Sequence, residues 1–279
     1  MARKVWLCNL VIFALLVSVD FAAGIDVAIC TVSHPMPQND ADQEIDVLRG
    51  AIQGAVDLQL FGAGDLDALA DWVQGHTSGK NHILILTGIL PTTLYASGNT
   101  EPDGSIVEEF LDAGNTIINT GEYTFYTIEG PQEANEDAAL PNILDAPDAS
   151  VWHGREGWRD GVVTMTPTAD GKKYTPSLVE YGTSYPIHVE DYEGTPWELE
   201  LAVAENTEEN LRVDGVIVNT ETGGRLGIFV QAYVGDIPAP DISWGAVIGE
   251  YILNYYLREV AEVQAEAKLV STWGEIKRF

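Results

Sequence analysis

The chain has 279 residues, 46% of them hydrophobic, and a formal net charge of −29 at pH 7. This length and composition suffice for one large domain with a packed core. The charge excludes nucleic acid and anionic membrane surfaces as favoured partners, because both repel a polyanionic protein. It favours solubility, tolerance of salt or an association with divalent cations.

The first 24 residues have the pattern of a secretory signal peptide. Two basic residues at 3–4 precede the apolar run 5–19, and small residues follow. The run is shorter than the roughly 20 residues that a membrane-spanning helix needs. We therefore expect cleavage near Ala23 or Gly24, a secreted or periplasmic protein, and no stable membrane insertion after cleavage.

Cysteine is scarce in this sequence. Cys8 and Cys30 are the only two, and Cys8 lies in the predicted signal peptide. The mature chain is thus expected to have a single thiol and no internal disulfide. Cys30 falls in the apolar run 25–32, where a small buried core residue is the expected role.

From residue 25 to residue 121, short apolar runs alternate with amphipathic stretches. The apolar runs predict strands at 25–32, 56–62, 82–88 and 115–121, and the amphipathic stretches predict helices at 42–55, 65–75 and 104–114. Asp65 and Ser105 are expected to begin helices, and Gly75 and Gly114 to end them. The alternation predicts a parallel sheet covered by helices on both faces. Ligands of such sheets bind beyond the carboxyl ends of the strands.

The second half of the chain has a different pattern of polar and apolar residues. Segment 131–150 is polar and is expected to be an exposed excursion with a short helix. Strand-like patterns are expected at 161–178, 185–194 and 197–209, a β-hairpin at 214–233 and the longest helix at 243–267. We assign residues 25–262 to a single domain and residues 263–279 to a C-terminal tail.

Several segments resemble the class I glutamine amidotransferase-like superfamily, and within it the trehalose-utilisation (ThuA-like) branch. "HILILTG" (82–88) is similar to the strand that supplies an oxyanion loop, and "SIVEEFLDAGNTIINTG" (105–121) is similar to the segment leading to the nucleophile elbow. "YPIHVEDYE" (185–193), "TETGGRLGIFVQAY" (220–233) and "WGAVIGEYILNYYL" (244–257) resemble later elements of that branch. The resemblance implies an α/β, flavodoxin-like three-layer sandwich with a mostly parallel central sheet and an added β-rich second half.

The chemistry of that superfamily is not expected here. It requires a Cys at the elbow, activated by a His that a Glu orients. The matching bend, residues 119–123, reads Asn-Thr-Gly-Glu-Tyr and has no thiol. Where the family has His-x-Glu after the second-half strand, this chain has Val230 and Gln231. A His-Val-Glu at 188–190 comes one strand pair too early, and we interpret it as alternating sides of a β segment.

Glu122 takes the position of the missing nucleophile. A carboxylate at a strand end can act as a base, a nucleophile or a ligand for a hydroxyl group or a metal. Together with a histidine and aromatic rings it suits a sugar, although a solvated turn with core aromatics below it would have the same sequence. The candidate catalytic residues are Glu122 and His34, and the candidate ligand-binding residues are Tyr95, Thr120, Tyr123 and Tyr126.

The sequence predicts no cofactor and no metal site. His34, His153 and His188 have no metal-binding spacing, and the Gly-x-Gly at 62–64 lacks the third glycine of a dinucleotide fingerprint. Two hypotheses remain. The first is a secreted binding or structural module without amidotransferase activity, with a carbohydrate or an envelope protein as partner. The second is a sugar-related hydrolase or isomerase of the trehalose-utilisation type that uses Glu122 and His34.

Overall fold

The structure is a computed structural model that describes residues 24–34, 36–99, 104–121, 124–125, 138–151, 163–208, 211–231 and 242–261. The predicted signal peptide and C-terminal tail lie almost entirely outside these residues and stay predictions. Within the described part, no helix combines the length and apolar character needed to cross a membrane.

Strands and helices alternate in the first half of the chain, as predicted. They are β1 (Asp26–Cys30), α1 (Gln38–Ile52), β2 (Asp57–Phe61), α2 (Leu66–Gly75), β3 (Ile83–Leu86), α3 (Ile106–Asp112) and β4 (Thr116–Asn119). The second half contains α4 (Ala139–Ile143), β5 (Val163–Pro167), α5 (Ala169–Tyr174), β6 (Tyr181–Thr183), β7 (Ile187–His188), the 3-10 helix η2 (Val189–Tyr192), β8 (Trp197–Asn206), β9 (Arg212–Asn219), β10 (Arg225–Ile228), α6 (Trp244–Tyr251) and the π-helical η3 (Ile252–Ala261).

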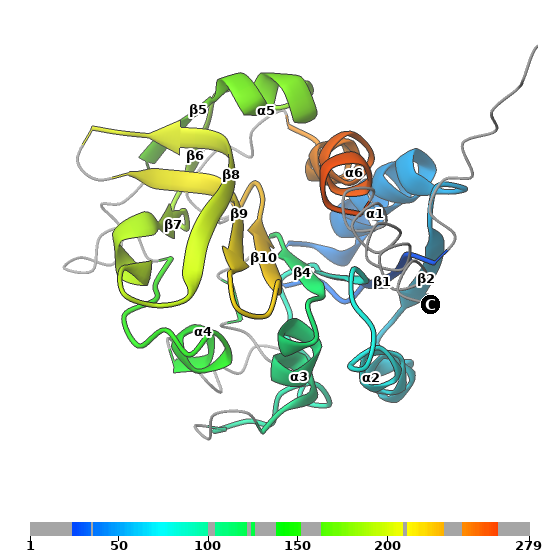
Figure 1. The fold of residues 1–279 in the computed structure, drawn as a ribbon. Coiled ribbons are helices and arrows are strands. Elements are labelled where there is room, and N and C mark those ends of the chain that lie inside the picture. The colour runs from blue at the N-terminus through cyan, green and yellow to red at the C-terminus, as the bar shows by residue number, and fades with distance from the viewer. Residues whose placement is uncertain are drawn as a thin grey trace, which may run out of the picture.

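The strands form one ten-stranded mixed sheet (Figure 1). Their order is β2-β1-β3-β4-β10-β9-β8-β5-β6, and β7 pairs with β9. Neighbours from β2 to β10 are parallel, whereas every pair beyond β10 is antiparallel. The prediction of a mostly parallel sheet is therefore wrong for the sheet as a whole. The predicted β9–β10 hairpin reverses the chain direction beside the parallel strands.

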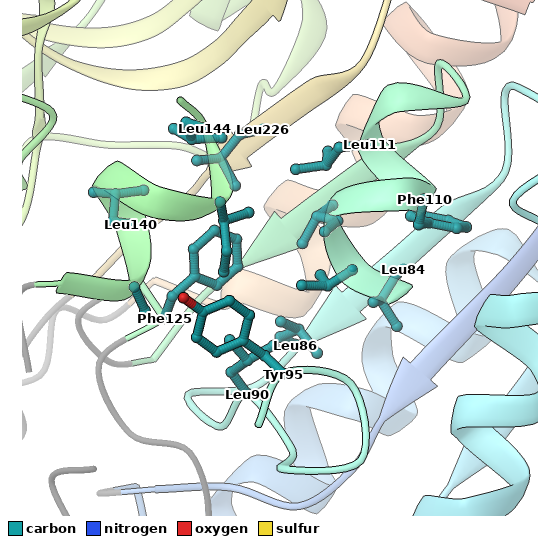
Figure 2. Packing of buried hydrophobic residues seen from close by; sticks show 14 of the residues in the cluster. Leu84, Leu86, Leu90, Tyr95, Phe110, Leu111, Phe125, Leu140, Leu144 and Leu226 are labelled. Atoms are coloured by element: carbon teal, nitrogen blue, oxygen red, sulfur yellow. The ribbon is translucent and has the colours of Figure 1, made fainter. Parts of the chain in front are cut away.

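Helices cover both faces of the sheet, and the core is correspondingly divided in two (Figure 1). Helices α2, α3 and α4 pack on one face, and α1, α5, α6 and η3 pack on the other. Figure 2 shows part of the first core, where Leu84 and Leu86 of β3 lie close to Phe110 and Leu111 of α3 and to Tyr95. Strands β1, β3 and β4 are buried almost throughout, as expected of parallel strands covered on both sides.

Four local predictions need correction. The described part of the expected exposed excursion, residues 138–150, is largely buried, because α4 packs in the first core. Segment 161–178 is not strand throughout, because Thr168 accepts a hydrogen bond from the Gly171 amide and starts α5. The predicted strand at 185–194 ends at His188, and the chain then turns into η2. The last helix is present, but it changes from α-helical to π-helical geometry at Ile252.

The antiparallel end of the sheet curls back on itself. Strand β6 is three places from β9 in the strand order, which in a flat sheet is roughly 14 Å. The Tyr181 hydroxyl of β6 nevertheless donates a hydrogen bond to Asp214 of β9. Thr183 of β6 likewise donates to the carbonyl of Gln231, just after β10. This curvature brings β6 over the carboxyl end of β10.

Candidate functional site

The carboxyl ends of four parallel strands, β1, β3, β4 and β10, meet at one edge of the sheet. We call this edge, formed by residues 31–34, 87–90, 119–121 and 229–231, the carboxyl edge. It is where an α/β sheet of this kind places its ligands.

Hydrogen bonds between neighbouring loops hold the carboxyl edge together. Thr87 Oγ1 lies 2.9 Å from the carbonyl oxygens of Cys30 and Val32, which joins the β3 loop to the β1 loop. Thr120 Oγ1 donates to the Phe229 carbonyl at 2.8 Å, which joins the β4 loop to the β10 loop. The Thr120 amide also donates to the Leu86 carbonyl at 3.1 Å, so hydrogen bonds link all four loops along the edge.

His34 lies on this edge, with its amide donating to the Thr87 carbonyl at 3.4 Å. Its ring Nδ1 is buried and has no hydrogen-bonding partner among the described residues. Burial lowers the pKa of His34, so the ring is neutral at pH 7. In a neutral imidazole one nitrogen donates and the other accepts. His34 can therefore offer a ligand one unused polar atom.

Tyr95 and Thr120 have their hydroxyls occupied. Tyr95 is fully buried, its hydroxyl donates to the Asn99 carbonyl at 2.9 Å, and Asn142 Nδ2 lies 2.6 Å from the same oxygen. The Thr120 hydroxyl makes the loop contact with Phe229 described above. Neither side chain presents an open hydroxyl, so their contact with a ligand stays a prediction that this geometry does not favour.

The bend after β4 is described only in part. Glu122, Tyr123 and Tyr126 lie outside the described residues, and their roles stay predictions. On either side, Gly121 has φ +89° and Phe125 has φ +63°. A left-handed backbone is common for glycine but costs a bulky residue on the order of 1–3 kcal/mol, and such strain concentrates at functional turns.

The thiol of Cys30 is unsuited to nucleophilic chemistry. Cys30 is fully buried in β1, as predicted. Burial raises the pKa of Cys30 to about 11, although a hydrogen bond with the backbone of Val32 acts in the opposite direction. Because the thiolate is the reactive form, the single thiol of the predicted mature chain is a packing group.

Asp214 is a buried carboxyl group at the same edge. It lies on β9 next to Gly215, which pairs with the last residue of β10. Its Oδ2 accepts the Val230 amide at 2.8 Å and the Tyr181 hydroxyl, while Oδ1 has no partner among the described residues. Burial raises the pKa of Asp214 to about 7, and the two hydrogen bonds oppose that rise in part. Asp214 can thus hold or release a proton near neutral pH.

Gln231 is the second buried polar residue beside β10. Its Nε2 donates to Thr124 Oγ1 at 2.9 Å, and its backbone carbonyl accepts the Thr183 hydroxyl. Its Oε1 is buried and has no partner within the described part of the chain. The residue between this glutamine and Phe229 is Val230, whose φ of +50° is rare for a β-branched residue. The strained backbone thus coincides with the unpaired polar groups.

Among the described residues, three polar side-chain atoms in or beside the carboxyl edge have no hydrogen-bonding partner: Gln231 Oε1, His34 Nδ1 and, on the neighbouring strand β9, Asp214 Oδ1. A buried acceptor without a donor costs about 1–3 kcal/mol, so Gln231 Oε1, and Asp214 Oδ1 when that carboxyl is ionised, gain from a ligand that donates a hydrogen bond. When Asp214 is protonated, Oδ1 donates instead and needs an acceptor, and a hydroxyl group can take either role. Hydroxyl groups are such donors, whereas an anion would meet two oxygen acceptors in a chain of charge −29. Three strand spacings, roughly 14 Å, separate the His34 loop from the Gln231 loop. Only an extended ligand can contact both.

Asp214 and Tyr181 were not predicted as site residues. A signal for Asp214 existed, since it is an acidic residue in the otherwise apolar run "DGVIVN". Tyr181 had none, because 33 residues separate it from Asp214 and only the curled sheet brings them together. Gln231 lies where the resemblance leads us to expect a histidine, and the sequence alone predicts no role for it.

No protein-family model matches the chain, and no curated protein matches its sequence. The resemblance to the amidotransferase-like superfamily consequently stays a prediction based on the quoted segments. The function has to be argued from the carboxyl edge itself.

Proposed function

We propose that this protein is a binding module for an uncharged, hydroxyl-rich ligand, a carbohydrate, held at the carboxyl edge beside Asp214 and Gln231. One observation carries the proposal: two fully buried side-chain oxygens of the described chain lie close to the same strand end without a donor. Sugar hydroxyls would supply those donors. The distance to His34 favours an oligosaccharide over a single sugar ring.

We also propose that the domain is a flavodoxin-like sandwich of the amidotransferase-like type that has lost its thiol chemistry. Its support is the order β2-β1-β3-β4, helices on both faces, and a bend after β4 without cysteine. The N-terminal sequence supports secretion or export to the periplasm, where glycans and envelope proteins are available as partners.

The binding proposal can be tested by isothermal titration calorimetry, after a thermal-shift screen of neutral sugars, oligosaccharides and sugar acids in the presence of a chelator. Gln231→Met removes the unpaired oxygen and nearly keeps the side-chain volume. We expect its dissociation constant for the best sugar to rise about five- to thirtyfold, because a hydrogen bond worth about 1–2 kcal/mol is lost. Gln74→Met makes the same change on the exposed surface of α2, and we expect it to bind like the wild type.

Two results would contradict the proposal. One is a screen in which no neutral sugar raises the melting temperature, since a ligand that binds only the folded state stabilises it by an amount that grows with ligand concentration. The other is equal affinity in the wild type and both variants. If only sugar acids raise the melting temperature, the ligand is not uncharged, but the carboxyl edge remains the proposed binding site.

A second candidate function is favoured by one observation, the pKa of about 7 for Asp214 next to the Tyr181 hydroxyl. A carboxyl group with such a pKa can act as a general acid or base. The sugar-related hydrolase or isomerase would then use Asp214 in addition to Glu122 and His34. Turnover of the bound sugar by the wild type, lost in Asp214→Asn and Glu122→Gln with binding retained, would favour the enzyme over the binding module.

A further inference from the structure

A second polar cluster lies at the opposite, amino-terminal edge of the sheet. Asp26 begins β1, His76 follows the last residue of α2, and His82 precedes β3. One ligand atom from each of the three residues lies within 4.8 Å of the other two. We propose that these residues bind one divalent transition-metal ion of the Zn²⁺ type.

The hydrogen bonds of His76 direct a lone pair at Asp26. His76 Nδ1 lies 2.6 Å from the Trp72 carbonyl oxygen, which can only accept, so Nδ1 carries the hydrogen. In the neutral ring Nε2 then has the lone pair, and it lies 2.8 Å from Asp26 Oδ2. Two electron-rich atoms this close need either a proton or a metal ion between them, and both rings and the carboxylate face the same point. Metal-binding histidines commonly have this arrangement, with the other ring nitrogen donating to a carbonyl.

The spacing of the three side chains suits a small ion. Ligands about 2.0–2.2 Å from a tetrahedral zinc ion are about 3.3 Å from one another. His82 Nδ1 is 3.5 Å from Asp26 Oδ2 and His76 Nε2 is 2.8 Å from it. All three ligand atoms lie within 4.8 Å of one another, so small movements of these side chains would bring them to the spacing of a zinc site. The Asp26 amide donates to His82 Nδ1 at a long 3.3 Å, and the ion would replace this weak bond.

The loop between α2 and β3 holds both rings in place. Asn115 Nδ2 donates to the carbonyls of His76 and Gly79, and Asn115 Oδ1 accepts the His82 amide at 3.0 Å. The rings of Trp72 and His76 stack with their centroids 4.1 Å apart. A side chain at Gly79 would begin 2.8 Å from His82 Nε2, so glycine leaves room for that ring. The site is thus pre-organised by residues that do not themselves bind the ion.

Electrostatics and exposure also favour a cation. The ten-residue helix α2 points its carboxyl end, the negative end of its dipole, at the cluster. The three side chains are 13–29% exposed, which allows an ion to enter and water to complete its coordination. Two histidines and one carboxylate are a ligand set of zinc and of other divalent transition metals.

Another cluster, at His188, Glu190 and Asp191, lacks these properties. Arg212 Nη1 lies 2.8 Å from both carboxylate oxygens of Glu190. The guanidinium thus already supplies the positive charge, and a metal ion would have to displace it. Of the two clusters in the described part of the chain, the one at Asp26 therefore supports the inference.

The test is a calorimetric titration of chelator-stripped, full-length protein with ZnCl₂. The wild type should bind one ion, and Asp26→Asn and His82→Asn should each raise the dissociation constant at least tenfold. Asp57→Asn is the matched control, because Asp57 pairs with Asp26 in register on the exposed strand β2. It should change the constant less than twofold.

Weak binding of several ions that Asp26→Asn leaves unchanged would mean that surface carboxylates alone are responsible, and would overturn the proposal. So would the absence of binding, or an equal loss in Asp57→Asn. If a variant fails to fold, ¹⁵N spectra of the histidine rings in the wild type test whether these two histidines bind zinc. Zinc should shift the ring nitrogens of His76 and His82 and leave those of His34 and His188; unchanged spectra would overturn the inference.

Discussion

Asp214 has a protonation state that its surroundings determine. It is fully buried between β6 and β10, accepts two hydrogen bonds on one oxygen and has none on the other within the described chain. Burial disfavours the charged form, which is why the pKa of Asp214 rises from 3.8 to about 7. The folded and unfolded protein therefore differ in the number of protons that they bind over a defined pH range.

The pH dependence of stability should reveal this residue. Between about pH 4 and pH 7 the folded protein keeps the proton of Asp214 while the unfolded chain releases it, so this group lowers the free energy of unfolding as pH rises. The pKa values correspond to a loss of up to about 4 kcal/mol across that window. Asp214→Asn removes this dependence, so the stability of the variant relative to the wild type should increase with pH.

Urea unfolding at several pH values between 4 and 8 measures the effect. Exposed Asp57, changed to Asn, is the control and should leave the slope of stability against pH as in the wild type. If the slope of Asp214→Asn is also that of the wild type, Asp214 is ionised in the folded protein and the description of the carboxyl edge is wrong.

Among the individual elements, α3 shows most directly how sequence fixes structure. Ser105 Oγ accepts the Glu108 amide at 3.3 Å, and Glu108 Oε2 accepts the Ser105 amide at 2.7 Å, a reciprocal capping box. Glu108 Oε2 also accepts the Gly104 amide at 3.1 Å. The predicted N-cap is thus confirmed. Asp65 likewise precedes α2 as predicted, but its carboxylate accepts the Gly62 amide instead of a helix amide.

Ser105→Ala should destabilise the protein by about 1 kcal/mol, within a usual range of about 0.5–2 kcal/mol for lost N-caps. The helix has only seven residues, and such short helices depend on their ends and on packing. Chemical denaturation measures the change. Ser78→Ala, at an exposed position in the loop after α2, is the control and should have little effect. Ser105→Thr should restore most of the lost stability, because its hydroxyl can accept the Glu108 amide and donate to Glu108 Oε2 as that of Ser105 does. A Ser105→Ala protein as stable as the wild type would contradict this explanation.

Helix α5 shows where element prediction fails. Its sequence begins with a capping threonine but contains Gly171, which weakens a helix pattern. In the structure Gly171 packs directly on β8, since a side chain there would begin 1.9 Å from the Val203 carbonyl oxygen. The glycine is present because of a tertiary contact, and a local pattern contains no information about that contact.

For the molecule as a whole, a buried ion pair links the parallel and antiparallel halves of the sheet. Arg225 on β10 makes a two-pronged contact with Glu200 on β8, with Nε–Oε2 and Nη2–Oε1 distances of 2.8 Å. Burial lowers the pKa of Arg225, but hydrogen bonds and the charge of Glu200 more than offset this and keep the pKa above its usual value. The pair crosses over β9, which lies between the two strands.

Replacing one partner of this ion pair should lower the free energy of unfolding more than replacing both partners. Arg225→Met leaves the Glu200 carboxylate poorly compensated, and we expect a loss of about 3–5 kcal/mol. Glu200→Met should have a similar effect, for the same reason. The double variant should be more stable than the sum of the two changes predicts, because no unpaired charge remains. Equilibrium unfolding of the three variants measures the coupling, and strict additivity would show that the contact adds no stability.

The sequence by itself determined the parallel half of the sheet, its covering helices, the β9–β10 hairpin and the burial of Cys30. These features follow from local patterns of apolar residues, caps and turns. Only the tertiary structure decided how β5 to β8 pair beyond that hairpin, the curl that brings Tyr181 to Asp214, and the meeting of Asp26 with His76 and His82. The physical reason is that 33 to 56 residues separate these partners. A local sequence pattern does not specify which distant residues become neighbours in the folded sheet.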